Sequence, residues 1–390
     1  MGTDEKESLA TALNTAIWRE DLDVVRQLLD AGADPNGSTP DNFTPLRSAA
    51  SRGFAAAIRL LLERGADPHA AKRFPNDGSY LQNAAQSGSV EAVRLLIDAG
   101  LSIHEIGSYG WTPLAAAATQ NRSIPEARNA AVVAELIARG SDVNTRDKYE
   151  KTPLHQAAQF TFAEAIRLLI ASGADPNAVD KRGSTPLHYA LPWYPYNYMD
   201  RPVEGVVRAL LAGGAQVNAA PSPARVTPLH IAAARAPSHV VGLLIQAGAD
   251  VNAATRQKRT PLTEALGNPD TFALLLDADA DVAPLVAAKG KPALISAAEK
   301  GNRIALAALL AAGADVNAVY RGRTALHLAV KKAHTGVIED LLKNGADHRA
   351  PDNDGMTALD LGRKRRRKAV RLLLEVAESA RIAKESSCHR

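Results

Sequence analysis

Four histidines are the residues whose type and spacing first suggest chemistry. Each closes a Thr-Pro-Leu-His or Thr-Ala-Leu-His segment, at His155, His188, His230 and His327. A metal site or catalytic centre would need these rings together. Stacked helices lie about 8–10 Å apart, whereas zinc ligands lie about 2 Å from the ion. The spacing therefore argues against a shared metal or catalytic role for these rings.

Other catalytic signatures are absent from the sequence. The single cysteine, Cys388, leaves no zinc-spaced Cys/His set and no internal disulfide. There is no GxxxxGK[ST] loop, no GxGxxG after a strand and no GxSxG elbow. Several aspartates recur with the period of the Gly-Ala-Asp segments and are interpreted as turn formers: Asp34, Asp67, Asp175 and Asp315. The sequence thus predicts no enzyme, no metal and no cofactor.

Aromatic side chains are concentrated in residues 191–202, LPWYPYNYMDRP. The whole chain has only 3 Trp, 8 Tyr and 6 Phe, and four of them lie here: Trp193, Tyr194, Tyr196 and Tyr198. Tyr and Trp give a large contact area with few rotatable bonds and are enriched at binding hot spots. We expect either a partner-binding loop or a loop that folds back on its own flank, fixed by its prolines.

Basic side chains gather in four predicted turn tips, at 219–226, 253–259, 283–291 and 318–323, which contain no acid. If successive tips line up along one edge, their cations form a positive row, called here the basic stripe. It would attract an acidic protein partner, or else be a solvated edge without a partner. The basic stripe comprises Arg225, Arg256, Lys258, Arg259, Lys289, Lys291, Arg321 and Arg323.

All these residues lie within a repeated segment. Its copies begin 32–42 residues apart, at Thr11, Thr44, Ser79, Thr112, Thr152, Thr185, Thr227, Thr260, Pro292, Thr324 and Thr357. Each copy predicts two short helices: a Thr caps the first, which Pro often opens, and a Gly ends the second. A single copy cannot bury its own apolar face, so stacked copies must share a core.

The repeat resembles the ankyrin repeat family. The matching residues are the four His-containing segments, TPL at 44, 112 and 260, and endings such as Gly32–Asn36 and Gly173–Asn177. The resemblance covers nearly the whole chain. It implies an all-α solenoid of about eleven helix-turn-helix units joined by β-turn or hairpin tips. It also implies that the recurring His supports turn hydrogen bonds, and that other proteins bind the concave face formed by tips and first helices.

Two copies are longer than the rest. From the first Thr to the closing Gly there are normally 21 residues, as from Thr44 to Gly65, but 28 from Thr112 and 29 from Thr185. Insertions in repeat proteins fall on exposed loops. The second insertion includes the aromatic segment 191–202. Function is therefore expected where the repeat pattern is broken.

The length of 390 residues alone would suggest two or three domains, but the repeats predict one array over residues 1–390. Its capping repeats are expected at about 4–36 and 350–382, with a disordered tail at 383–390. Net charge is +4, hydrophobic content is 46 %, and no apolar run reaches the 18 residues that a membrane span needs. The N-terminus has no apolar core typical of a secretory signal. We expect a monomeric cytoplasmic protein that makes no membrane contact.

The run RKRRRK, from Arg363 to Lys368, resembles a nuclear-localisation or nucleic-acid patch. Because AVRLLL follows at once, we interpret it as the start of the last repeat's second helix. The predicted function is a non-catalytic protein–protein interaction scaffold. The alternative is a nucleic-acid-associated regulatory factor that uses the basic tips and this run, in a nuclear or host-cell location. Absence of interleaved stacking aromatics weakens that alternative.

Overall fold

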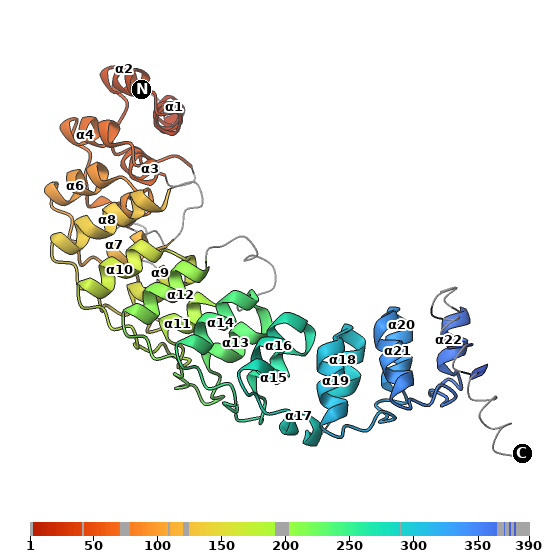
Figure 1. The fold of residues 1–390 in the computed structure, drawn as a ribbon. Helices are drawn as coiled ribbons and strands as arrows, with labels where there is room; N and C mark the ends of the chain where they lie inside the picture. The colour runs from red at the N-terminus through yellow and green to blue at the C-terminus, as the bar shows by residue number, and fades with distance from the viewer. Residues whose placement is uncertain are drawn as a thin grey trace, which may run out of the picture. The chain divides into compact units, whose positions relative to one another are not determined.

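The structure, a computed structural model, describes residues 3–40, 43–70, 79–107, 110–119, 125–191, 203–288, 290–364, 370, 374–375 and 378–379. Within these ranges every regular element is a helix. The one β feature among them is an isolated bridge between Tyr320 and Arg323. The prediction of an all-α fold is confirmed, and the helices pair along the chain (Figure 1).

The first compact unit contains the chain to Leu191 and then α12 to Pro221. Its first helices form one layer and its second helices the other (Figure 1). In chain order they are α1 (Thr3–Trp18), α2 (Leu22–Asp30), α3 (Pro45–Arg52), α4 (Ala55–Glu63), α5 (Tyr80–Gln86), α6 (Val90–Asp98), α7 (Pro113–Ala117), α8 (Glu126–Ala138), α9 (Pro153–Phe160), α10 (Ala163–Ala171), α11 (Pro186–Ala190) and α12 (Val203–Ala212).

The second compact unit contains the chain from Ser222 onward. It has the same two layers. Its elements are α13 (Pro228–Arg235), α14 (Ser238–Gln246), α15 (Pro261–Glu264), the 3-10 helix η3 (Ala265–Gly267), α16 (Pro269–Asp277), α17 (Ala283–Ala287), α18 (Ala293–Lys300), α19 (Arg303–Ala311), α20 (Ala325–Lys332), α21 (Thr335–Lys343) and α22 (Ala358–Lys364). The single array over 1–390, with its two capping repeats, stays a prediction, and the 383–390 tail lies outside the described residues.

One repeat shows why this sequence forms two helices. Thr44 is extended and its hydroxyl accepts a hydrogen bond from the Arg47 backbone N–H, while Pro45 follows at the first helical position. Proline is favoured there because the N–H that it lacks would have no helical partner. Gly65, after α4, has a φ of +88°, a left-handed conformation that glycine adopts without penalty. Leu46, Ile58 and their equivalents form the buried core.

Between repeats, Asn and Asp side chains join the turns that follow the second helices. The Asn144 amide donates to the Gly173 carbonyl at 3.0 Å, and its oxygen accepts from the Asp175 N–H at 3.0 Å. The Asp175 carboxylate in turn accepts from the Asn177 N–H at 2.8 Å. Asp34, Asp67 and Asp315 accept in the same way from the residue two positions on. The interpretation of these aspartates as turn formers is therefore confirmed.

Two segments differ from the expected pattern. The tip predicted at 283–291 begins with the short helix α17, in which Leu285 is buried. The carboxylate of Asp281, which precedes the helix, accepts from the N–H of its first residue, Ala283. A buried leucine in a run without an early glycine favours a helical turn over a hairpin. The first helix after Thr260 is also short, because it passes into η3 before Asn268 caps α16.

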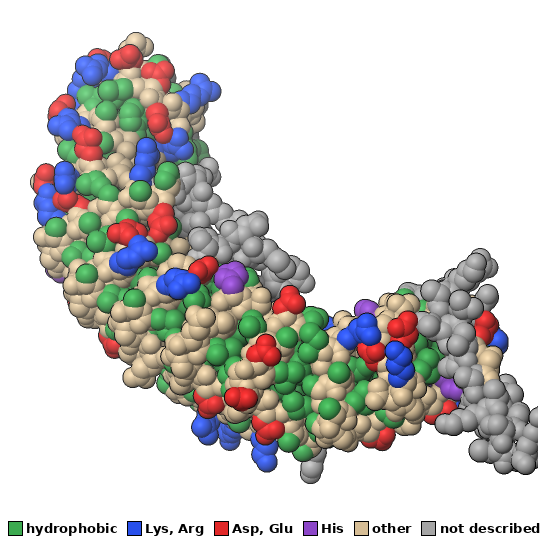
Figure 2. Space-filling model, in the orientation of Figure 1, with side chains coloured by type: hydrophobic (Ala, Val, Ile, Leu, Met, Phe, Trp, Pro, Cys, Tyr) green, Lys and Arg blue, Asp and Glu red, His purple; other side chains and the backbone are tan. Residues whose placement is uncertain are grey.

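The outer faces of the second helices carry ion pairs between neighbouring helices in both units, in the second unit between Arg303 of α19 and Asp340 of α21 at 2.7 Å. In the first unit, ion pairs join neighbouring helices, as between Arg59 and Glu91 at 3.0 Å and between Arg94 and Glu135 at 2.7 Å. In the second unit, the surface over α14, α16 and α19 is mainly hydrophobic with scattered acids (Figure 2). Exposed ion pairs contribute little each, about 0.2–1 kcal/mol.

Candidate functional site

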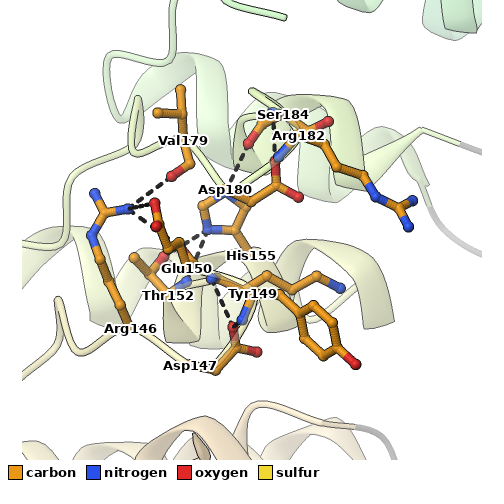
Figure 3. A network of polar contacts seen from close by, with 11 residues as sticks. Arg146, Asp147, Tyr149, Glu150, Thr152, His155, Val179, Asp180, Arg182 and Ser184 are labelled. Atoms are coloured by element: carbon orange, nitrogen blue, oxygen red, sulfur yellow. Dashed lines mark hydrogen bonds and ion pairs between the residues drawn. The ribbon is translucent and has the colours of Figure 1, made fainter. Parts of the chain in front are cut away.

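A recurring histidine connects its repeat to the next, as Figure 3 shows for His155. His155 Nδ1 accepts from the Thr152 backbone N–H at 3.1 Å and lies 2.9 Å from its hydroxyl. Because Nδ1 accepts from an amide, the ring proton is on Nε2, which donates to the Ser184 carbonyl at 3.0 Å. Both nitrogens are thus occupied. The expected turn-supporting role is confirmed for this residue.

The Nδ1 contact recurs at the other three positions, and the Nε2 contact recurs at two of them. The ring Nδ1 of His188, His230 and His327 each accepts from the N–H of the Thr three residues earlier. Nε2 of His230 donates to the Arg259 carbonyl at 3.0 Å, and Nε2 of His327 donates to the Met356 carbonyl at 3.2 Å. Among the described residues no group of three or more His, Cys, Asp or Glu side chains is placed to hold a metal ion.

Burial favours the neutral form of the His155, His230 and His327 rings. His155 is fully buried, and this desolvation lowers its pKa from 6.5 to about 4, against the opposing effect of the Ser184 carbonyl. Burial also lowers the pKa of His230 and of His327. A neutral imidazole with one acceptor and one donor nitrogen matches the observed bonds. These histidines stabilise the stack and have no free nitrogen for a ligand.

Two aspartates, the buried Asp180 and the half-buried Asp147, hold their tips in place. Asp180 Oδ1 accepts from the backbone N–H groups of Arg182 and Ser184, and Oδ2 accepts from the Tyr189 hydroxyl at 2.7 Å. Asp147 holds its own tip through the N–H groups of Tyr149 and Lys151. These residues are drawn in Figure 3, except for the Tyr189 contact. The acid of a tip is therefore a structural element.

A half-buried contact connects the tip that contains Asp147 to the first helices. The Lys151 ammonium lies 4.5 Å from the centre of the Tyr189 ring and 3.3 Å from the Gln159 amide oxygen. Burial lowers the pKa of Lys151, whereas burial and the Asp180 carboxylate raise the pKa of Tyr189. Tyr189 also meets the His155 ring edge-on, with centroids 5.4 Å apart. Sequence reasoning missed Tyr189, although it directly follows the recurring His.

Two large apolar side chains stand on neighbouring tips of the first unit. Tyr149 is 55 % exposed and Ile106 is 70 % exposed. The tips are joined, because the Trp111 indole donates to Asp147 at 3.3 Å and the Lys181 N–H donates to the Tyr149 carbonyl at 3.0 Å. Exposed aromatic and branched side chains on a rigid edge are typical of binding surfaces. Neither residue was singled out from the sequence.

The aromatic segment predicted to bind a partner lies outside the described residues. This applies to Trp193, Tyr194, Tyr196 and Tyr198, and their role stays a prediction. The helices that flank the segment are described: α11 ends at Ala190 and α12 begins at Val203. The insertion therefore joins a first helix to a second helix.

Part of the basic stripe is paired with acids from outside the tips. Arg259 lies 2.8 Å from Glu264 of α15, and Lys291 lies 2.5 Å from Glu299 of α18. Arg323 lies 3.3 Å from the buried Asp352 and 3.6 Å from Asp354. The sequence of the tips alone could not indicate these acids, because they belong to the next first helix or the next tip. Lys289 lies outside the described residues.

The other members of the basic stripe are exposed. Arg225, Arg256, Lys258 and Arg321 have no ion pair with any described residue. Arg321 contacts the neighbouring Tyr320 ring at 5.4 Å. The first two tips are joined directly, since the Arg256 N–H donates to the Ala224 carbonyl at 3.0 Å. The structure thus brings Arg225, Arg256 and Lys258 onto adjoining tips.

The run at 363–368 corrects one expectation. Arg363 and Lys364 lie in α22, which is the first helix of its repeat, so these two residues do not open the second helix as expected. Cations are favourable at a helix C-terminus, where they meet the negative end of the helix dipole. Arg363 also lies 3.7 Å from Glu375. The rest of the run lies outside the described residues.

These features define a class of protein: stacked two-helix repeats joined by hydrogen-bonded tips. The family model for ankyrin repeats (3 copies) matches residues 2–72, 125–219, 202–285 and 294–384. The chain belongs to the ankyrin repeat family. Ankyrin repeats generally mediate protein–protein interaction, and the family is mostly non-catalytic.

Curated relatives match parts of the chain. It is 33 % identical over 161 residues to the ankyrin repeat and KH domain-containing protein mask-1 of Caenorhabditis elegans, covering 40 % of this chain and 6 % of that protein. It is 35 % identical over 142 residues to the nuclear factor NF-kappa-B p105 subunit of Gallus gallus, covering 35 % and 14 %. It is 29 % identical over 157 residues to the palmitoyltransferase AKR1 of Lachancea kluyveri, covering 38 % and 21 %. The chain therefore spans a small part of each of these relatives. No helix in its described part is long and apolar enough to cross a membrane.

Proposed function

We propose that this chain is a non-catalytic scaffold that binds another protein through the tips and first helices of its first unit and through the inserted segment 191–202. The observation that carries the proposal is the pair of exposed side chains Tyr149 and Ile106 on hydrogen-bonded neighbouring tips. Each can add apolar contact area at a small entropic cost, since the backbone beneath is already fixed. The half-buried Tyr189 and Lys151 continue this surface toward the first helices.

The histidines support the non-catalytic part of the proposal. A general base needs a nitrogen within hydrogen-bond reach of a substrate proton, but both nitrogens of His155 are engaged by Thr152 and Ser184. The similarity to a palmitoyltransferase covers 21 % of that enzyme. Incubation of pure protein with acyl donors and hydrolase substrates tests this part, because any turnover would contradict it.

Affinity capture tests the binding surface. Partners are captured from the cells in which the protein occurs with three proteins. These are the intact chain, the double variant Tyr149→Ala, Ile106→Ser, and a variant that lacks residues 192–202. The matched control is Ile304→Ala, an exposed apolar residue on the second helix α19. We expect both test variants to lose a partner that the control retains. Equal capture by all four proteins would refute the proposed surface.

The inserted segment needs a separate test, because it was also expected to pack on its own flank. Replacement of Trp193 and Tyr196 by Ala should reduce capture and leave the melting temperature unchanged. Lost stability with unchanged capture would favour the packing alternative. We further propose a monomer located in the cytoplasm. Light scattering and fractionation test these two points.

The basic stripe is proposed to attract an acidic protein partner. Arg225, Arg256, Lys258 and Arg321 support this by being exposed and without an acid among the described residues. Association should then slow steeply as salt rises. The alternative partner is nucleic acid, which would bind random duplex with a steep salt slope. Comparison of an acidic protein with duplex DNA at equal salt separates the two.

A further inference from the structure

Two adjoining tips of the second unit place a cation where other tips have glycine. In the tip that follows Asp180, the turn is closed by the N–H of Gly183, whose φ is +73°. The same bond is made at 2.9 Å by Arg225 to the Ser222 carbonyl and by Lys258 to the Thr255 carbonyl. These two residues have φ values of +55° and +60°. Both are held in a left-handed conformation that costs energy for any residue with a Cβ.

The same two tips contain no acidic residue. Asp180 holds its tip by accepting from backbone N–H groups. In the tip at 255–259 the Thr255 hydroxyl accepts from the Arg259 N–H at 3.0 Å instead. The neutral Thr255 hydroxyl therefore takes the place of the carboxylate, and this tip has one negative charge fewer than the tip that contains Asp180. Together the two tips contain four cations, Arg225, Arg256, Lys258 and Arg259, and only Arg259 has an acid beside it.

Backbone strain by itself does not require positive charge. In the first unit, the equivalent left-handed position of one tip is Glu150, with a φ of +62°, and this residue faces Arg146 at 3.9 Å. Its charge is opposite and has a partner within the tip. The cations Arg225 and Lys258 face no acid among the described residues. A strained residue that is also an unpaired charge is expected at a binding site rather than at a purely structural turn.

We propose that Arg225, Arg256 and Lys258 form a site for an extended acidic peptide segment with carboxylates about three residues apart. This inference rests on the proposed function and specifies the partner for one part of the basic stripe. Packed helices of neighbouring repeats lie about 8–10 Å apart. An extended chain in the polyproline II conformation advances about 3.1 Å per residue with three residues per turn, so positions i and i+3 share one face. Carboxylates at positions i and i+3 therefore match cations on adjoining tips.

Fluorescence anisotropy with two labelled twelve-residue peptides tests the site. Both contain two Glu in an otherwise uncharged Ser/Thr/Gln sequence, at positions 5 and 8 in one and at 5 and 6 in the other. The 5,8 peptide should bind the full chain more tightly, with affinity falling steeply between about 50 and 300 mM salt. The double variant Arg225→Gly, Lys258→Gly should weaken its binding about tenfold, at the upper end for two exposed charge pairs.

The glycine variants also change stability, because glycine adopts the left-handed conformation of positions 225 and 258 without strain. The double variant should melt about 2–4 °C higher than the unaltered chain. Glu150→Gly is the matched control: it relieves the same strain in the first unit and should leave peptide binding unchanged. A lower melting temperature or reduced peptide binding in this control would overturn the inference.

Three other results would overturn it: equal peptide binding by the double glycine variant, equal binding of the 5,6 peptide, or tighter binding of a labelled trinucleotide, whose two phosphodiesters carry the same number of charges. These results leave the proposed function standing if Tyr149→Ala, Ile106→Ser still abolishes capture. If that variant captures normally while the 5,8 peptide depends on Arg225 and Lys258, the first-unit surface fails and the peptide site stands.

Discussion

Acidification should destabilise the stack through His155. The ring is neutral in the folded chain because burial lowers its pKa to about 4, whereas the exposed ring of an unfolded chain titrates near 6.5. Between these values the unfolded state binds more protons, so the free energy of unfolding falls as pH falls. The contribution of His155 is fully present above about pH 6.5. It is lost progressively toward pH 4 and stays constant below.

The expected size follows from that pKa shift. A difference from 6.5 to about 4 corresponds to roughly 3 kcal/mol when the titration is complete. At about pH 5 the unfolded ring is almost fully protonated and the folded ring is still mostly neutral, which gives a loss of about 2 kcal/mol relative to pH 7.5. His230 and His327 titrate in the same direction, so a variant must isolate the contribution of His155.

The repeat beginning at Ser79 provides that variant. There Gln82 replaces the histidine: its oxygen accepts from the Ser79 N–H and its amide donates to the Trp111 carbonyl. His155→Gln should therefore keep both connections without titrating. Urea unfolding followed by circular dichroism, for both proteins between pH 5 and 7.5, measures the difference. The stability gap should shift by about 2 kcal/mol in favour of the variant at pH 5, and a constant gap would refute the reasoning.

Other substitutions test the remaining contacts by the same unfolding measurement. Asp180→Ala should cost about 2–3 kcal/mol because it leaves three donors unpaired, whereas Tyr189→Phe removes one of these bonds and should cost about 1 kcal/mol; equal costs would contradict the tip assignment. Asn144→Ala breaks two bonds between repeats and should cost about 1–2 kcal/mol. Gly355→Ala meets only the penalty of a φ of +74°, about 1 kcal/mol. Gly322→Ala should cost more, since its Cβ would lie 1.8 Å from the Asn353 side chain.

The recurring helix-start and helix-end residues made much of the fold predictable. Thr44 and Pro45 indicate the start of a helix, and Gly65 indicates the end of one, because their conformational preferences act over a few residues. Where such signals were absent the prediction failed: the stretch around Leu285 forms α17 although a tip was expected. The placement of Arg363 at the end of α22 was missed for a similar reason. A basic run indicates charge but does not indicate which of two consecutive helices contains it.

The sequence by itself determined the two-helix unit and the resemblance to the ankyrin repeat family, because both depend on residues fewer than about forty positions apart in a periodic pattern. That resemblance in turn implied the structural role of the recurring histidines. Only the tertiary structure decided which side chains remain available. Arg259 and Lys291 meet acids of the following helices, whereas Arg225 and Lys258 do not. Tyr149 stands exposed, while Tyr189 is held by Asp180. Pairing and exposure depend on what the neighbouring repeat places opposite a side chain, and periodicity does not specify that.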